Sequence, residues 1–379
     1  MKSGRKKVKQ QSYYDYSMLI LVIFIVAFGL VMVYSASSYT AQTKQEYNYD
    51  AAYFLKRQAW AVLLGIVAML IVSKFDYRLL IRPIGHLKIR LVTCLYLLSI
   101  VLQIVVLFVG KELNGSKRWL NIAGMGFQPS EITKIAVILY TSYLIYKAPR
   151  AMNKGLGVLR VFIFMLVPIM AVAIENFSTA LVIGVIMAGI CFVSSKKKWF
   201  YGIAALLCTG VGGLFIVLGG AYRVERFEIW RNIETHEKGH QIRQGMYAIA
   251  SGGMFGTGLG QSMQKLGFIP EAFNDMIFTI ICEELGLFGA IVVVSMFLIL
   301  IWRIFIIAVN APDLFGGLIC AGVLIHIALQ VILNICVVTN FVPATGVSLP
   351  FISYGGTSVS ILLAEMGLVL SVSNRIESR

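Results

Sequence analysis

The chain has 379 residues, of which 58% are hydrophobic and only 13% are charged. This composition excludes an ordinary soluble enzyme and indicates a protein that lies mostly within a membrane. The net charge of +15 does not indicate a nucleic-acid partner, because basic residues cluster in the tail 1–16, the connection 74–90 and the run 196–198, beside apolar stretches. That distribution predicts membrane topology and contacts with lipid headgroups.

About ten stretches are apolar enough to cross a bilayer as helices, which takes about 20 residues each. We expect them near 17–36, 58–73, 91–110, 131–146, 158–175, 179–195, 200–219, 276–302, 314–340 and 357–373. The sequence therefore predicts an all-α polytopic membrane protein with both termini in the cytoplasm. A cleaved signal peptide is the alternative for the first stretch, but its apolar run is longer than is usual for one.

No long hydrophilic segment remains for a second domain, so we expect residues 1–379 to form one membrane-embedded unit. Residues 1–16 form a basic cytoplasmic tail, and 220–275 is a large extracytoplasmic loop between the seventh and eighth spans. The six cysteines all fall within predicted spans and none has CxxC spacing. They are expected to pack as small apolar residues, with neither a disulfide framework nor a zinc site.

Polar residues gather in three predicted outer connections, 110–130, 220–275 and 340–356. The third has two prolines and several glycines, which predict non-helical backbone at the membrane boundary. Such backbone is tolerated only where protein or a water-filled cavity satisfies its polar groups. We therefore expect the functional site on this side of the membrane.

The fourth predicted span begins with Glu131 and Lys134 one helical turn apart on one face. They form either an ion pair near the membrane interface or an ionisable pair that lines a polar cavity. Just before them, Lys117 and Arg118 flank Trp119, which indicates either an interfacial anchor or a phosphate contact.

The start of the 220–275 segment mixes arginines, among them Arg223 and Arg226, with apolar residues three apart. This pattern predicts a helix on the membrane surface, which either anchors the segment or lets arginines bind a phosphate-bearing headgroup. Gly256, Gly258 and Gly260 follow, with a spacing that fits no nucleotide-binding loop. We expect them to form tight turns and to allow close backbone approach to a ligand.

Four carboxylates, Glu271, Asp275, Glu283 and Glu284, stand around the start of the eighth span. Asp275 is either the N-cap of that helix or a base at the mouth of a cavity. Glu271 shares its face only if the helix begins early. Glu283 and Glu284 lie about 12 Å deeper at 1.5 Å per residue, and we expect them to be buried and hydrogen-bonded.

The ninth span carries His326, Gln330 and Asn334 on one face, and Glu365 lies within the tenth. His326 is expected to be a hydrogen-bonded core residue, because no second histidine is placed to share a metal with it.

Several long segments resemble the signature segments of the SEDS family, whose members include RodA and FtsW. The segments are "RWLNIAGMGFQPSEITKIA", "NFSTA", "SGGMFGTGLGQSMQKLGFIPEAFNDMIFTIICEELGLFG" and "PATGVSLPFISYGGTS". The similarity runs in order over nearly the whole chain and is closer to the FtsW branch. It implies a peptidoglycan glycosyltransferase that polymerises lipid II at the outer face of the bacterial cytoplasmic membrane.

The resemblance implies that Asp275 is the essential aspartate and that Glu131 and Lys134 line the cavity. Two departures from the family pattern stand nearby. Phe273 and Asn274 replace a histidine and a threonine, and Asn176 stands where an acid is usual. The second departure leaves any role of that acid unfilled.

In the implied reaction, Asp275 takes the proton of the attacking sugar hydroxyl, and the product inverts the donor linkage. The diphosphate of lipid II needs positive charge, for which the available donors are Lys134, Arg118, Arg223 and Arg226. Further substrate-binding candidates are Lys265, Glu271 and Ser353. A divalent cation, Mg²⁺ or Mn²⁺, is a possible cofactor, although no ligand cluster in the sequence demands one.

The resemblance also implies partners: a monofunctional class B penicillin-binding protein and other membrane proteins of the divisome, at the division septum. Three alternatives remain: a RodA-type polymerase of cell elongation, a lipid II flippase, and a scaffold without catalytic activity. The flippase is less favoured, because the polar residues concentrate on the outer side and not at the membrane midplane.

Overall fold

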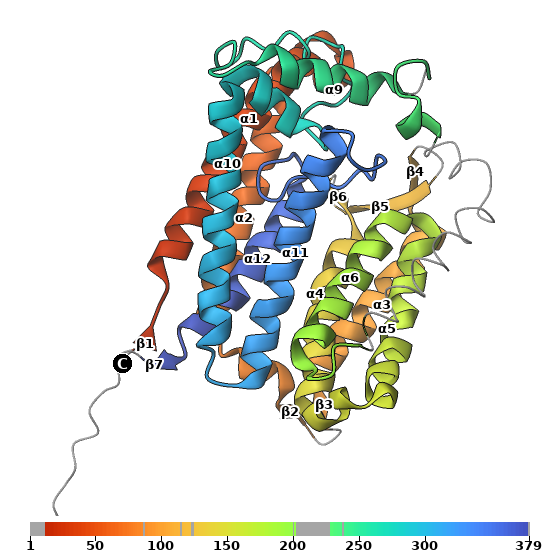
Figure 1. Cartoon of the computed structure of the whole chain (residues 1–379), viewed down its shortest axis with the longest axis vertical. Coiled ribbons are helices and arrows are strands. Elements are labelled where there is room, and N and C mark those ends of the chain that lie inside the picture. Colours follow the sequence, from red (N-terminus) through yellow and green to blue (C-terminus); the bar gives the residue numbers. More distant parts are fainter. Residues whose placement is uncertain are drawn as a thin grey trace, which may run out of the picture.

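The computed structural model describes residues 12–85, 88–113, 116–122, 125–199, 201, 228–236 and 239–377. Within these ranges the chain is a bundle of long helices, joined by loops, short helical turns and small β-hairpins (Figure 1). The long helices are α1 (Tyr16–Thr43), α2 (Tyr53–Lys74), α3 (Leu91–Val109), α4 (Pro129–Lys147), α5 (Gly155–Glu175), α6 (Phe177–Ser194), α10 (Ile277–Val309), α11 (Leu314–Val338) and α12 (Gly356–Ser373).

Shorter elements connect these helices. The helical ones are η1 (Gln45–Tyr47), η2 (Tyr77–Ile81), η3 (Pro149–Asn153) and α9 (His240–Ser251). The strands are β1 (Ser12–Tyr13), β2 (Pro83–Ile84), β3 (Ile89–Arg90), β4 (Lys111–Leu113), β5 (Ser116–Ile122), β6 (Met125–Phe127) and β7 (Ile376–Glu377). They form three small antiparallel sheets, β1–β7, β2–β3 and β4–β5–β6, that sequence analysis did not predict.

The predicted all-α, multi-pass architecture is confirmed. In the described part of the chain, eight helices are long and apolar enough to cross a membrane: α1, α2, α3, α5, α6, α10, α11 and α12. α4 has 19 residues but includes Glu131 and Lys134, whose charges lower its mean hydropathy. The predicted span at 200–219 falls almost entirely outside the described residues, so ten spans remains a prediction.

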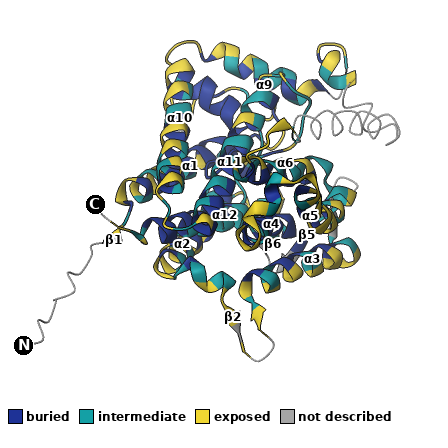
Figure 2. Ribbon diagram, turned by 60° about the horizontal axis from the view of Figure 1, so that its bottom comes forward, coloured by how far each residue is buried: buried dark blue, intermediate teal, exposed yellow. Residues whose placement is uncertain are grey.

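Exposed residues follow the outer faces of the helices (Figure 2), and many of them are large and apolar. Trp60, Phe108 and Trp302 are each at least 60% exposed, as expected for helices whose outer faces lie in lipid. The two ends of the described chain meet, because Ser12 pairs with Glu377 in the β1–β7 sheet. This pairing places both ends on one side of the bundle, and their cytoplasmic location stays a prediction.

Short polar side chains cap several helices where the sequence places them. Asp15 accepts a hydrogen bond from Met18 N (2.9 Å) at the start of α1, and Asp313 caps α11 in the same way. Asp15 also binds Arg303 of α10, with 2.7 Å between Oδ1 and Nη2. This ion pair joins α1 to α10 at the end of the bundle where the chain ends meet.

α10 is interrupted at Gly286, whose φ of 68° and ψ of −166° are outside the helical region. The segment 253–258 crosses this break and supplies the missing backbone partners. Thr257 N donates to Glu283 O (2.9 Å), Gly258 N to Glu284 O (3.0 Å) and Leu287 N to Gly253 O (2.9 Å). These bonds satisfy backbone groups that an interrupted membrane helix leaves unpaired.

The expected tight turns at the glycine-rich segment are confirmed, since Gly256, Gly258 and Gly260 all have positive φ. The expected approach to a ligand stays a prediction, whereas the close approach seen at Gly256 is to α10. A Cβ on that residue would lie 2.1 Å from Glu284 O, so its closeness serves the contact with the broken helix α10.

Replacing Gly286 by alanine should destabilise the fold strongly. Its backbone conformation is nearly restricted to glycine, and a Cβ would lie 2.4 Å from Gly256 N and 2.6 Å from Met254 O. We expect a loss of at least about 2 kcal/mol, measured as a lower Tm in detergent. Gly184→Ala is the matched control, because no atom lies within 4 Å of its added Cβ. Equal Tm values for the two variants would contradict this account of the break.

Candidate functional site

A cavity of about 970 Å³ lies between α2, α4, α6, α11 and α12, and is bordered by the segment before α10. Backbone of the connections 346–348 and 354–355 also borders it, as expected for non-helical chain beside a cavity. The lining combines apolar side chains with charged and amide groups. The charged and amide-bearing residues are Arg57, Gln128, Glu131, Lys134, Asn176, Gln241, Glu271, Asn274, Asp275 and Gln330.

Glu131 and Lys134 form a buried ion pair on the wall of this cavity, with 2.9 Å between Oε2 and Nζ. They lie in the first turns of α4, which begins at Pro129, a residue suited to the first helical position. Ser358 of α12 also donates a hydrogen bond to Glu131 Oε2 (2.9 Å). The structure thus unites the two alternatives from sequence, because the ion pair itself lines the cavity.

Asp275 lines the same cavity from the turn that precedes α10. That helix begins at Ile277 with Met276 in the N-cap position, and no side chain caps it. The N-cap interpretation of Asp275 is therefore wrong. Asn334 of α11 fixes the backbone of this turn instead, since its Nδ2 donates to Asp275 O (2.7 Å) and to Val347 O (2.9 Å).

Glu271 also lines the cavity, but in a turn with a φ of 46° and not on a helical face shared with Asp275. Asn274 Nδ2 donates to Glu271 Oε2 (2.6 Å), so the asparagine at the family's threonine position holds this carboxylate. Phe273, at the histidine position, is 3% exposed and packs on Phe54, with 4.3 Å between ring centroids. Phe273 and Asn274, the first departure from the family pattern, thus have structural roles beside the predicted base.

Asn176 fills the position of the absent acid and has a role of its own. Its Oδ1 accepts a hydrogen bond from Thr179 N (3.1 Å), which caps α6, and the residue lines the cavity. An amide caps a helix about as well as a carboxylate, so the substitution keeps the cap and removes one negative charge from the cavity wall.

Three residues predicted to bind substrate are not part of the cavity lining. Lys265 is 5% exposed and its Nζ lies 2.7 Å from Glu284 Oε1. Ser353 is buried, and its Oγ accepts a hydrogen bond from Leu349 N (2.8 Å). Arg118 donates through Nε to the carbonyl of Glu175 (2.9 Å), which links β5 to the end of α5.

Arg223 and Arg226 lie outside the described residues. Arg57 lines the cavity, yet sequence analysis did not select it, because it stands just before the predicted second span among other polar residues. The sequence feature that could have indicated a role for Arg57 is its position as a basic residue at the membrane boundary. Gln330, which also lines the cavity, was noted in sequence only as part of a polar face of α11.

The predictions for the deeper polar residues are confirmed. Glu283 and Glu284 are at most 2% exposed and hydrogen-bonded. His326 Nδ1 lies 2.9 Å from Glu365 Oε2, and both side chains are buried between α11 and α12.

The fit of a divalent cation was tested on the same residues. Mg²⁺ and Mn²⁺ prefer carboxylate and other oxygen ligands. Within the described ranges, no three His, Cys, Asp or Glu side chains come together as a metal site. The side chains within the described ranges therefore do not form a site for such an ion.

The family model of FtsW, RodA and SpoVE, described as "Cell cycle protein", matches residues 15–378. The chain belongs to this family. The match covers nearly the whole chain, including all of the long helices and the cavity between them. The family assignment made from the signature segments is thus confirmed.

Curated relatives agree with the family assignment. The chain is 36% identical over 371 residues to the probable peptidoglycan glycosyltransferase FtsW of Trichlorobacter lovleyi, covering 95% of this chain and 93% of the relative. It is 34% identical over 374 residues to the stage V sporulation protein E of Bacillus subtilis, covering 95% of this chain and 96% of the relative.

Solved structures share the fold. One, described as "Structural coordination of polymerization and crosslinking by a peptidoglycan synthase complex", matches with a TM-score of 0.80 at 26% identity, covering 95% of this chain and 97% of the other. The rod shape determining protein RodA of Thermus thermophilus matches with a TM-score of 0.67 at 24% identity, covering 97% and 98%. The second likeness concerns the fold alone.

The pair of Glu131 and Lys134 yields a stability prediction. Lys134→Met leaves the buried Glu131 carboxylate without its cation, which should cost about 3 kcal/mol of unfolding free energy. The double variant Glu131→Gln, Lys134→Met removes both charges and should recover most of the Tm in detergent.

Lys56→Met is the control, because the Lys56–Asp50 pair is exposed and should matter little. A Lys134→Met protein as stable as wild type would show that the pair is not buried as the structure has it.

Proposed function

We propose that this protein is an inverting glycosyltransferase that polymerises lipid II into peptidoglycan at the outer face of the cytoplasmic membrane. The observation that carries the proposal is one cavity lined by both a carboxylate, Asp275, and a buried cation, Lys134. A glycosyl transfer from a lipid diphosphate needs both groups. The proposal is supported by the FtsW relative, which is named a probable peptidoglycan glycosyltransferase.

In the proposed reaction, the 4-hydroxyl of the acceptor sugar attacks the anomeric carbon of the donor. A new carbon–oxygen bond forms there while the bond from that carbon to the diphosphate breaks, which inverts the configuration. The hydroxyl proton passes to the Asp275 carboxylate. An aspartate is a weak base, so much of the rate must come from positioning of the two sugars. Asn334 contributes to that positioning by fixing the Asp275 backbone.

The departing diphosphate carries negative charge that the cavity must stabilise. Lys134 and Arg57 line the cavity and supply positive charge from α4 and α2. Glu131 holds Lys134 in place through the 2.9 Å ion pair. Arg118, Arg223 and Arg226 remain candidates for contacts with the diphosphate or with lipid headgroups.

The partner that we propose is a monofunctional class B penicillin-binding protein, together with other divisome membrane proteins. The match to a complex described as coordinating polymerization and crosslinking supports this partner. A septal role in division is proposed from the FtsW relatives, and elongation is the alternative. The family is consistent with a multi-pass protein in the cytoplasmic membrane, and we propose that the cavity opens to the outside.

The decisive test is polymer formation by the purified protein in detergent from fluorescent lipid II, analysed on a gel. Asp275→Asn should abolish polymer, because an amide cannot accept the proton, while the Tm stays close to that of wild type. Asp50→Asn, in an exposed pair on the connection between α1 and α2, is the control and should polymerise normally.

Polymer made without a bilayer excludes a pure flippase and a scaffold. No polymer from the wild-type protein, with its partner supplied, would contradict the proposed function. Substantial polymer from the Asp275→Asn variant would remove Asp275 as the base and make Glu271 the next candidate.

A further inference from the structure

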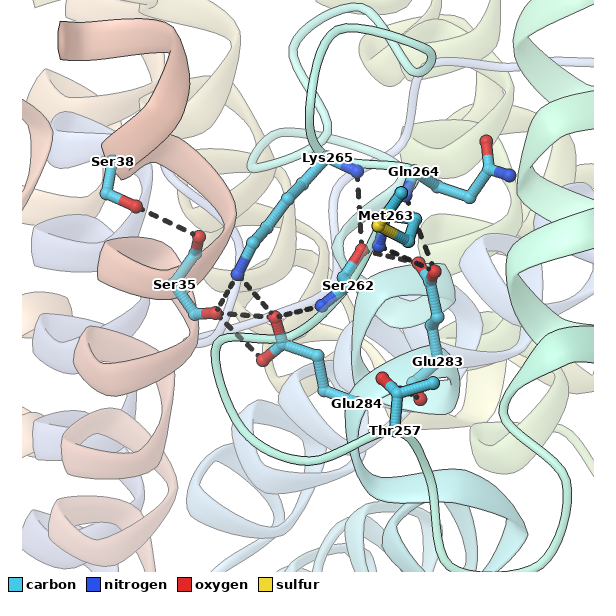
Figure 3. A network of polar contacts seen from close by, with 9 residues as sticks. All are labelled: Ser35, Ser38, Thr257, Ser262, Met263, Gln264, Lys265, Glu283 and Glu284. Carbon is cyan, nitrogen blue, oxygen red and sulfur yellow. Dashed lines mark hydrogen bonds and ion pairs between the residues drawn. The ribbon is translucent and has the colours of Figure 1, made fainter.

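A buried polar network joins α1, the segment 262–265 and α10 (Figure 3). At its centre, Lys265 Nζ lies 2.7 Å from Glu284 Oε1 and donates to Ser35 Oγ (3.0 Å). Ser35 Oγ in turn lies 2.7 and 2.8 Å from the two Glu284 oxygens. All three residues are at most 6% exposed. We call Ser35, Lys265 and Glu284 the latch.

The neighbouring acid of α10 strengthens the same attachment. Glu283 accepts hydrogen bonds from Ser262 Oγ and from the backbone N of Met263 (2.9 Å). Two consecutive carboxylates of α10 therefore hold one short turn of the chain, and Figure 3 shows both aimed at it. The turn and this part of α10 are fixed to each other as one unit.

The contact between Lys265 and Glu284 closes a loop of the chain, and Asp275 lies within that loop. Lys265 and Glu284 are 19 residues apart in sequence, and Asp275 stands near the middle of that interval. One arm is the turn segment 266–274, and the other is the first part of α10, from Ile277 to the break at Gly286. If the latch opens, only the Glu283 contacts still join the two arms that lead to Asp275.

If the latch served only to stabilise the fold, buried charges would not be the favoured choice of side chains. Burying an ion pair costs desolvation, and replacing such a pair by uncharged groups of similar size is often neutral for stability. The same two helices, α1 and α10, are also joined at their other end by Asp15 and Arg303. The charges of the latch are therefore not needed merely to hold α1 against α10, whereas they specify one geometry for the turn that they bind.

We propose that Lys265 and Glu284 are positioning residues that set the place of Asp275 at the mouth of the cavity. This inference rests on the proposed function, in which Asp275 takes a proton from the acceptor sugar. The latch acts through the chain on either side of Asp275 and touches no substrate. It replaces the substrate-binding role that sequence analysis gave to Lys265.

The experiment compares two double variants. Lys265→Met, Glu284→Gln removes both latch charges together, which avoids an unpaired buried charge, and the glutamine still accepts a hydrogen bond from Ser35. Asp15→Asn, Arg303→Met removes the ion pair at the other end of the same helices, and asparagine still caps α1. Each protein is assayed for Tm, kcat and KM with fluorescent lipid II in detergent.

We expect the latch variant to keep a Tm near that of the control variant while its kcat falls about 10- to 100-fold, because displacement of a reacting group by about 1 Å costs this much. Its KM should change little, since the latch does not contact substrate. The control variant should keep the wild-type kcat. Equal kcat values for the two double variants would overturn the proposal.

Hydrogen exchange provides a readout that does not depend on activity. Backbone amides of 266–276 should exchange about tenfold faster in the latch variant than in the control variant, because the latch contacts that join the two arms are lost. If the wild-type protein makes no polymer, the proposed function fails, and the exchange result still decides whether the latch holds the Asp275 segment. Unchanged exchange in the latch variant would overturn the proposal.

Discussion

The structure depends on the hydrogen bonds that pair the backbone groups of α10 where this helix is interrupted inside an apolar bundle. A break at Gly286 leaves carbonyl and amide groups of a membrane helix without helical partners, and lipid offers none. The segment 253–258 supplies those partners, and this pairing brings the glycine-rich loop down onto α10. The first part of α10, the loop and Asp275 between them are consequently held as one unit against α1 and α11. The mouth of the cavity owes its shape to this arrangement.

A second constraint is the cost of charge within the bundle. Three of the acids buried within α4, α10 and α12, namely Glu131, Glu284 and Glu365, are each bound to a basic side chain from the same helix, a loop or a neighbouring helix. The fourth, Glu283, accepts hydrogen bonds from Ser262 and a backbone amide. Such pairing is what keeps ionisable groups tolerable at membrane depth. One of the three pairs, Glu131–Lys134, lines the cavity in which we propose that the diphosphate binds. The other two are enclosed by protein and act on the geometry of the bundle.

Much of the fold could be predicted from the sequence, because the length and spacing of apolar runs are local properties. The pairing of Glu131 and Lys134 on a cavity wall could be predicted for the same reason, since their spacing within one helix places them together. The place of Lys265 outside the cavity lining could not be predicted, because its partner Ser35 lies 230 residues away, a contact that no local pattern reveals. From the sequence, Asp275 was a candidate helix cap. The structure around the start of α10 depends on tertiary hydrogen bonds such as that from Asn334 to Asp275 O, which the local sequence does not show. Arg57 could be recognised as a cavity residue only from the packing of α2 beside the cavity.

The central claim is that the cavity binds the lipid-linked donor and acceptor beside Asp275. A cryo-electron microscopy structure of the protein bound to lipid II or a non-hydrolysable analogue tests it most directly. The account predicts diphosphate density within hydrogen-bond distance of Lys134 or Arg57, with a sugar hydroxyl facing the Asp275 carboxylate. A substrate bound at another face of the bundle, with these three side chains turned away from it, would contradict the account.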